Sequence, residues 1–420
     1  MKQGWEIKKL GEICDFQNGF AFKSNTYKET GLPILRITNI QNQTLELNDL
    51  VYFDAKDYKE NFDRFKVFKD DLVVAMSGAT TGKLGINTTD TVFYLNQRVG
   101  KFIPKSQIAK PFLYYFLSTK VEESLRIAAG AAQPNLSTEQ INNFEIPLPP
   151  LPEQQRIVAI LDEAFPAIAK AKANAEQNLK NAKELFESYL QGVFENGNWE
   201  EKKLNEITEV KDGTHESPKY IKEGIPFVTQ KNIRQDGLSF SDTRFITEAD
   251  HEKFYKRSNV TFGDILISMI GANRGMAAIV DDERIFSIKN VGLIKESKNI
   301  NKYFLLYYLK SSLAMKYVLY MSNGGAQEFV GLTALRSFPI PYPSLKDQQI
   351  IVQKLDALSA ETKKLEAIYQ QKINDLEELK KSILQKAFAG ELRSPEGAEY
   401  TNDVATPLAK KKTITNPERA

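Results

Sequence analysis

Residues 144–158, FEIPLPPLPEQQRIV, have a counterpart at residues 338–352, FPIPYPSLKDQQIIV, 194 positions later. In both copies a short apolar run ends in a proline-rich joint, and a Gln-Gln pair then opens a stretch rich in Ala, Leu, Glu, Lys and Gln. That composition is typical of a long helix. The quoted stretch therefore marks a junction between a globular part and a long helix, and the chain contains this junction twice.

Other segments recur at nearly the same interval, which indicates a duplicated chain. WEIKKLGEI at residues 5–13 matches WEEKKLNEI at residues 199–207 in seven of nine letters. GLPILRITNI at 31–40 corresponds to GIPFVTQKNI at 224–233, DLVVAMSGATTG at 71–82 to DILISMIGANRG at 264–275, and LFESYLQGVF at 185–194 to LKKSILQKAF at 379–388. Because the order is kept throughout, the sequence predicts two copies of one structural repeat.

Each copy has two parts of different composition. Residues 1–150 and 196–345 mix short apolar runs with Gly, Pro, Asn and Asp, which predicts short strands, turns and a few helices. Residues 151–195 and 346–390 are predicted to form the two long helices. The tail, residues 391–420, is polar and aperiodic, and we expect it to be disordered.

Apolar residues recur every seven positions along both predicted helices, which is typical of a coiled coil. Two polar residues, Asn178 and Lys372, occupy the same register; they either fix it or lie outside the packed segment. Pro166 predicts a kink in the first helix. The predicted fold class is α+β, with two pseudo-symmetric α/β domains separated by two long antiparallel coiled-coil helices. The predicted seam comprises Ile157, Leu161, Ile168, Leu185, Ile351, Leu355, Leu365, Leu376 and Leu379.

Composition excludes several classes of protein. The 56 Lys and Arg residues nearly balance the 54 Asp and Glu residues, so a nucleic-acid partner would have to be held by local patches. The single Cys14 excludes an internal disulfide, and the two histidines exclude a three-histidine metal centre. The sequence shows no apolar run of about 18 residues, the length needed to span a membrane. We therefore expect a cytoplasmic protein without a metal site.

The sequence lacks motifs for catalysis. GATTGKLG, at residues 78–85, resembles a phosphate-binding loop, but it has three residues between its glycines where that loop needs four. Leu84 also stands where Ser or Thr would bind magnesium. His215 could act as a base, yet the first copy has no counterpart. We therefore predict that the chain is not an enzyme and has no cofactor of its own.

Binding chemistry is better represented, because polar side chains follow the predicted strands. Lys, Arg, Asn, Gln, Ser and Thr are the residues that read base edges and hold phosphates. Each one could equally be a solvated loop residue or a turn cap. Across the two copies the shaping residues persist, as in Gly78 and Gly271, whereas neighbouring polar letters differ. The DNA-binding candidates are Arg36, Thr38, Asn39, Ser77, Thr80, Thr81, Lys83, Gln97 and Arg98 in the first copy, and Thr214, His215, Thr229, Lys231, Asn232, Asn273, Arg274, Lys289 and Asn290 in the second.

With two globular domains, each followed by a helix that opens in PLPEQQRI or PSLKDQQII, the chain resembles the specificity (S) subunit of a type I restriction-modification system. The resemblance covers residues 1–390 and rests on the ordered strings quoted above together with DGTHESP at residues 212–218. The first copy departs from that last string, with NGFAFKS at residues 18–24.

The resemblance implies that residues 1–150 and 196–345 are target-recognition domains, each reading half of an asymmetric bipartite site on double-stranded DNA. It implies that the helices set the gap and dock methyltransferase subunits, which carry S-adenosylmethionine and methylate adenine. ATP-dependent restriction subunits, which use ATP and magnesium, would complete the assembly. The competing hypothesis is a coiled-coil scaffold that binds proteins and recognises no DNA sequence. Target bases and gap length do not follow from the sequence.

Overall fold

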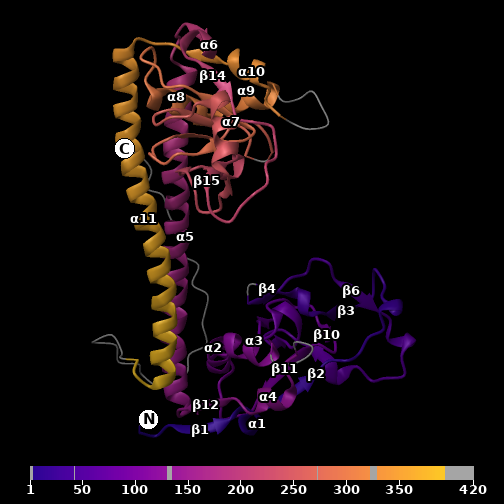
Figure 1. Ribbon diagram of the computed structural model, residues 1–420. Coiled ribbons are helices and arrows are strands. Elements are labelled where there is room, and N and C mark those ends of the chain that lie inside the picture. Colours follow the sequence, from indigo (N-terminus) through magenta and orange to yellow (C-terminus); the bar gives the residue numbers. More distant parts are fainter. Residues whose placement is uncertain (1–2, 42, 130–134, 272, 322–328, 393–420) are drawn as a thin grey trace, which may run out of the picture. The chain divides into compact units, whose positions relative to one another are not determined.

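The computed structural model describes residues 3–41, 43–129, 135–271, 273–321 and 329–392. The chain divides into two compact units (Figure 1): unit 1 is residues 1–172 with 374–420, and unit 2 is residues 173–373. Each unit therefore contains one turn-rich domain and a part of both long helices. The tail was predicted to be disordered over residues 391–420, and its residues from 393 onward lie outside the described part of the chain.

Unit 1 folds its turn-rich domain around two sheets and a terminal strand pair. One sheet has the order β6-β3-β10-β7, the second has the order β2-β11-β8-β9-β5-β4, and β1 pairs with β12. The strands are β1 (Glu6–Lys9), β2 (Cys14–Asn18), β3 (Leu32–Leu35), β4 (Ile40–Gln41), β5 (Thr44–Leu45), β6 (Val51–Phe53), β7 (Lys66–Val67), β8 (Leu72–Ala75), β9 (Leu84–Ile86), β10 (Phe93–Leu95), β11 (Val99–Pro104) and β12 (Glu145–Leu148); the short helices are α1 (Leu10–Ile13), α2 (Lys110–Thr119), α3 (Val121–Ala129) and α4 (Thr138–Asn142).

Unit 2 repeats this plan with shorter sheets. Their orders are β18-β15-β21 and β14-β22-β19-β20, with separate pairs β16-β17 and β13-β23. The strands are β13 (Glu201–Lys203), β14 (Val210–Asp212), β15 (Ile225–Val228), β16 (Ile233–Arg234), β17 (Gly237–Leu238), β18 (Arg244–Ile246), β19 (Ile265–Ser268), β20 (Ala277–Ile279), β21 (Ser287–Ile288), β22 (Val291–Ile294) and β23 (Pro339–Pro341); the helices are α6 (Leu204–Ile207), α7 (Glu248–Ser258), α8 (Lys302–Lys310), α9 (Ser312–Met321) and α10 (Leu332–Arg336).

Strand registers show that the two domains are equivalent residue by residue. In the parallel pair β3–β10, Leu35 lies opposite Leu95, and in β15–β21, Val228 lies opposite Ile288. Both pairs of positions differ by 193 (228 − 35 and 288 − 95). The same shift relates Ile34–Val51 to Phe227–Arg244 in the neighbouring antiparallel pairs. The predicted duplication is therefore a duplication of structure.

The WEIKKL and FEIPLP motifs close each domain on itself. β1 pairs antiparallel with β12 in unit 1, and β13 pairs with β23 in unit 2. Apolar residues just after the first strand, Leu10 and Ile13, are 1% and 0% exposed and enter the domain core. The motifs recur because each copy must join its own first and last strands.

Two long helices complete the fold, α5 (Leu151–Glu195) and α11 (Leu345–Ala389), each about 68 Å long at 1.5 Å per residue. In unit 1 the first part of α5 packs with the last part of α11, because Ile157 and Leu161 share a core with Ala387. In unit 2, Leu190 near the end of α5 shares a core with Leu355 near the start of α11. The helices therefore run in opposite directions, as predicted. α5 continues as helix through Pro166.

The predicted heptad seam is only partly buried. Ile157, Leu161 and Leu355 are 0% exposed, and Ile168, Ile351 and Leu376 are half-buried. Leu185, Leu365 and Leu379 are 51%, 37% and 47% exposed, so their placement in a closed seam was wrong. A straight helix with 3.6 residues per turn drifts by about 20° per heptad, which carries a strict seven-residue line out of the interface. Asn178 and Lys372 are exposed and lie outside the packed segment.

The two Gln-Gln pairs join each domain to its helix. Gln154 and Gln348 are both 0% exposed. The Gln154 Oε1 atom accepts a hydrogen bond from the Ala109 amide just before α2, and its Nε2 donates to the carbonyls of Gln107 and Pro149. Gln348 accepts from the Asn301 amide before α8 and donates to the Pro343 carbonyl. The motif thus encodes a buried clamp.

No helix in the described ranges combines the length and the apolar character needed to cross a membrane.

Candidate nucleic-acid interface

The predicted polar residues of unit 2 lie on four connections at strand ends. These are the segment after β14, the turn after β15, the β19–β20 connection and the β21–β22 turn. A bridge between Thr214 and Lys289 joins the first connection to the last. The Lys289 amide also donates to the Val228 carbonyl, which brings in the turn after β15. Three of the four connections therefore meet.

They enclose a hollow of about 600 Å³. Five predicted residues line it: Thr229, Lys231, Asn232, Lys289 and Asn290. The sequence did not single out the other lining residues, which are Tyr220, Phe227, Gln230, Asp242 and Arg244. Asn273 and Arg274 lie on the β19–β20 connection and do not line this hollow.

The hollow carries an excess of positive charge. Its one lining carboxylate, Asp242, is paired with Arg234 at 3.1 Å. Arg244 lies over the Tyr220 ring at 4.6 Å from its centroid, and the Lys289 ammonium donates to the Ser217 hydroxyl. Among the residues that the structure describes, Lys231, Lys289 and Arg244 have no carboxylate partner. An acceptor-rich ligand would therefore be favoured there.

His215 stands beside the hollow in a fixed orientation. Its Nε2 lies 3.1 Å from Asp212 Oδ2, and its Nδ1 lies 2.7 Å from Asn290 Oδ1. Asp212 is itself only 5% exposed, and its Oδ1 also accepts hydrogen bonds from Nε and Nη2 of Arg257, a residue of α7. At the positions equivalent to α7, unit 1 has the short 3-10 helices Ala55–Asp57 and Asp63–Phe65, and Asn18 stands in place of Asp212, so this arrangement belongs to the second domain. The anchored carboxylate holds an exposed imidazole at the rim.

The candidates of unit 1 occupy the matching connections. Arg36 follows β3, and its Nη2 donates to the Asp49 carbonyl. Lys83 on the β8–β9 connection contacts Gln41 Oε1 at 3.4 Å. Gln97 and Arg98 lie exposed in the β10–β11 turn, and the Arg98 carbonyl accepts from the Met76 amide at the start of the β8–β9 connection. The candidates therefore gather at corresponding places in both units.

Two of the predicted asparagines hold the loops in shape. Asn39 and Asn232 are 2% and 3% exposed. Asn39 accepts from the Arg36 amide and donates to the carbonyls of Glu46 and Asn48. Asn232 accepts from the Thr229 amide and donates to the Ser239 carbonyl. In this structure neither side chain can reach a base edge, so we correct their role from reader to scaffold.

Three further candidates are buried: Ser77, Thr81 and Thr214, at 6%, 0% and 4% exposure. The Thr81 hydroxyl donates to the Gly78 carbonyl, and the Thr214 hydroxyl accepts from the Glu216 amide. We correct Thr81 and Thr214 to scaffold positions too; Ser77 is buried, but its hydroxyl makes no hydrogen bond within the part of the chain that the structure describes. The remaining candidates are exposed or half-buried: Arg36, Thr38, Thr80, Lys83, Gln97, Arg98, His215, Thr229, Lys231, Asn273, Arg274, Lys289 and Asn290.

The glycines shared by the two copies shape the β8–β9 and β19–β20 connections. Gly78 and Gly271 have φ values of +73° and +76°, and Gly82 and Gly275 have +82° and +87°. Residues with a Cβ atom rarely adopt this left-handed conformation. The main-chain path is therefore fixed, and the side chains between the glycines are free to differ.

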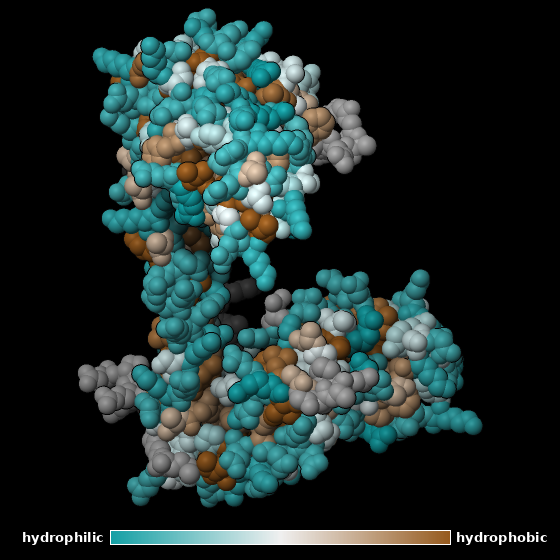
Figure 2. All heavy atoms as spheres, viewed as in Figure 1, coloured by the Kyte–Doolittle hydropathy of each residue, from teal (hydrophilic) through white to brown (hydrophobic). Residues whose placement is uncertain are grey.

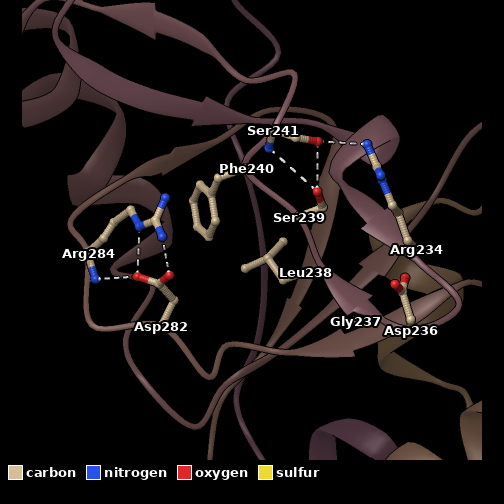
Figure 3. Close-up of a pocket in the computed structure, with 9 residues that line it drawn as sticks. All are labelled: Arg234, Asp236, Gly237, Leu238, Ser239, Phe240, Ser241, Asp282 and Arg284. Carbon is tan, nitrogen blue, oxygen red and sulfur yellow. Dashed lines mark hydrogen bonds and ion pairs between the residues drawn. The ribbon is translucent and has the colours of Figure 1, made fainter.

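A second hollow of about 500 Å³ lies beside the β16–β17 hairpin (Figure 3). Arg284 is paired with Asp282 on one wall, at 2.7 Å, and lies over the Phe240 ring. Arg234 on the other wall donates to the Ser241 hydroxyl and to Asp242. Because both arginines are neutralised within the protein, this hollow is a weaker anion site than the first.

The surface is predominantly polar. Figure 2 shows hydrophilic side chains over most of the visible face of each turn-rich domain, with apolar residues scattered among them. Within the described ranges, no group of three or more His, Cys, Asp or Glu side chains is arranged to hold a metal ion.

The chain matches a family model described as the type I restriction modification DNA specificity domain, twice, at residues 2–179 and 196–378. It is 25% identical to the EcoBI type I specificity subunit of Escherichia coli, over 94% of this chain and 88% of that protein. It is 23% identical to the EcoKI specificity subunit of Escherichia coli strain K12, over 95% and 91%.

Two solved structures share the fold. One comes from work on complex assembly and conformational transition of the type I R-M system, with a TM-score of 0.74 and 20% identity, covering 93% of this chain and 99% of that one. The other is the HsdS subunit from Thermoanaerobacter tengcongensis, with a TM-score of 0.61 and 20% identity, covering 93% and 98%.

Proposed function

Because the chain belongs to the family of type I restriction-modification DNA specificity proteins, we propose that it reads an asymmetric bipartite DNA site, one half with each turn-rich domain. It directs partner subunits to that site and performs no catalysis itself. Family membership does not favour the alternative of a protein-binding scaffold without DNA recognition.

One observation supports two independent readers. The strand pairs β3–β10 and β15–β21 keep the same register in the two domains, whereas the side chains at the equivalent strand ends differ. Arg36 and Thr38 of unit 1 correspond to Thr229 and Lys231 of unit 2. Sequence-specific contacts come from side chains that reach base edges, so one frame with different side chains suits two different half-sites.

The partners follow from the same proposal. Double-stranded DNA is the ligand, methyltransferase subunits bring S-adenosylmethionine, and restriction subunits bring ATP and magnesium. The assembly works in the cytoplasm, where the DNA is, and the paired helices set the gap between the half-sites. The near balance of charge suits a subunit that grips DNA firmly only when its partners close around it, since phosphate neutralisation supplies much of the affinity for DNA.

A methylome experiment tests the function. The chain is expressed with the methyltransferase subunit from its own genome in an unmodified host, and the host DNA is sequenced for modified adenine. We expect one split motif, and we expect one half to change when residues 1–150 are exchanged for those of a relative with a different target. A stable complex of the two proteins that leaves the DNA unmethylated would instead support the scaffold hypothesis.

A further inference from the structure

The hollow of unit 2 presents three cations at positions where unit 1 has none. The 193-residue shift established by the strand registers pairs Lys231 with Thr38, Lys289 with Asn96 and Arg244 with Val51. One aromatic wall is common to both domains, because the bridges Lys28–Tyr52 and Ile221–Phe245 make Tyr27 and Tyr220 equivalent. The two domains therefore share the strand pairing and the tyrosine at this place, and they differ in the three side chains that carry the positive charge in unit 2.

The three side chains share one chemistry. Lysine and arginine are hydrogen-bond donors without acceptors. Asp242, the carboxylate of the hollow, is already bound by Arg234, and the Asn290 oxygen faces His215. Lys231 is exposed, and its ammonium makes no hydrogen bond to any residue that the structure describes. The site thus offers mainly free donors.

Acceptor-only surfaces on DNA are the phosphate oxygens, the minor-groove edges of A·T pairs and the major-groove edge of guanine; Arg or Lys on the last of these is the commonest specific contact. Guanine presents N7 and O6 there, whereas adenine and cytosine each present an amino donor, and thymine adds a methyl group to its one acceptor. Phosphate contacts only position a reader on its duplex and carry no sequence information, so two readers on one frame could share them. The three cations are instead replaced by Thr38, Asn96 and Val51 in unit 1, which suits contact with a base edge better.

We propose that Lys231, Lys289 and Arg244 form a specificity-determining subsite of unit 2 that reads a guanine in its half of the target. This inference rests on the proposed function, and it adds the base class and the residues responsible. The half-site read by unit 2 then contains a G·C pair whose recognition depends on these three side chains.

The test grafts the unit 1 residues into unit 2: Lys231→Thr, Arg244→Val and Lys289→Asn, in the full chain with its own methyltransferase. Because unit 1 carries these residues on the same frame, the variant is expected to fold, and thermal unfolding checks this. The single variant Lys231→Thr removes an exposed side chain that makes no internal hydrogen bond, so its result stands even if the triple variant is unstable. Lys256→Thr, on an exposed part of α7, is the matched charge control.

The readout is the methylation rate on a panel of duplexes that differ at single positions of both half-sites. We expect discrimination to fall by about 5- to 150-fold at one G·C position of one half, since a good base contact is worth ~1–3 kcal/mol. The other half and Lys256→Thr should be unchanged. A uniform loss of rate on all duplexes would mean that the cations hold phosphate, and unchanged discrimination in both variants would mean that they hold nothing; either result overturns the inference. Absence of a split motif for the wild-type chain would instead refute the proposed function.

Discussion

Replacing Gln154 by alanine should destabilise unit 1 far more than the same change at the next residue. The Gln154 side chain makes hydrogen bonds of 2.8, 3.0 and 2.8 Å with one main-chain amide and two carbonyls. In the alanine variant all three main-chain groups would lose their hydrogen bond to this side chain, and Gln154 is 0% exposed. A buried group that loses its partner costs ~1–3 kcal/mol, and water entering the gap recovers part of that. We expect a loss of about 3 kcal/mol.

Gln155 provides the control within the same motif, because it is exposed and lies on the same turn of α5. Its replacement by alanine should cost under about 0.5 kcal/mol, as surface changes usually do. In unit 2, Gln348 makes two such hydrogen bonds, so Gln348→Ala should cost about 2 kcal/mol, with the exposed Gln349 as its control.

The assay is urea unfolding of the full chain, combined with hydrogen exchange at the two amides that the glutamines accept from, Ala109 and Asn301. Each alanine variant should lose protection at its own amide and keep it at the other. Gln154→Glu keeps the size and an acceptor but loses the amide donor, so it should not rescue stability. Equal costs for Gln154→Ala and Gln155→Ala would refute the clamp.

Three further outcomes follow from single residues. Gly82→Ala should lower the free energy of unfolding by ~2 kcal/mol or more, because φ is +82° and the new Cβ would lie 2.7 Å from the Ser124 Cβ. Gly78→Ala should cost only ~1 kcal/mol in the same urea titration, because the nearest atom to its new Cβ, Ile37 Cδ1, is 3.9 Å away. Burial raises the pKa of the Cys14 thiol to about 12, so iodoacetamide at pH 8 should label the native chain orders of magnitude more slowly than the urea-unfolded chain; equal rates would show that unit 1 opens freely. Burial lowers the pKa of His251 below its ordinary value of 6.5. As the pH drops below 6.5, the unfolded chain therefore protonates this imidazole before the folded chain does, and the free energy of unfolding falls. The difference between the urea midpoints at pH 7.5 and pH 5.5 should accordingly be smaller in His251→Asn than in the wild-type chain.

The duplication made most of the fold predictable. A nearly constant interval between matching strings implies equal structures, and strand registers separated by 193 residues bear this out. Composition and apolar period predicted the two long helices, and the shared cores confirm the prediction that they run antiparallel. The seam did not follow in detail, because a seven-residue count cannot detect the slow rotation of a straight helix that leaves Leu185 and Leu379 exposed.

The candidate recognition surface was harder to predict, for reasons that individual residues show. Arg244 and Tyr220 reach the hollow only because β18 pairs with β15 and Ile221 bridges Phe245, and no local pattern reports such pairings. Helix α7, which anchors Asp212 through Arg257, takes the place of two short 3-10 helices in the first copy, so comparing the copies does not predict it.

One available signal would have identified two of the scaffold residues among the polar candidates. Asn39 and Asn232 are the same letter at equivalent positions, and both are buried under the following loop. When two copies of a domain share a fold, a polar residue that is identical in both is expected to stabilise that fold, because the fold is what the copies have in common. Difference alone does not mark a reader, because Ser77, Thr81 and Thr214 differ from their counterparts and are nevertheless buried. A polar position that differs and is also accessible is the stronger candidate, since two half-sites of one duplex differ in their bases and local shape. The exchange of Thr38 for Lys231 and of Asn96 for Lys289 is therefore better evidence of sequence reading than the abundance of polar loops.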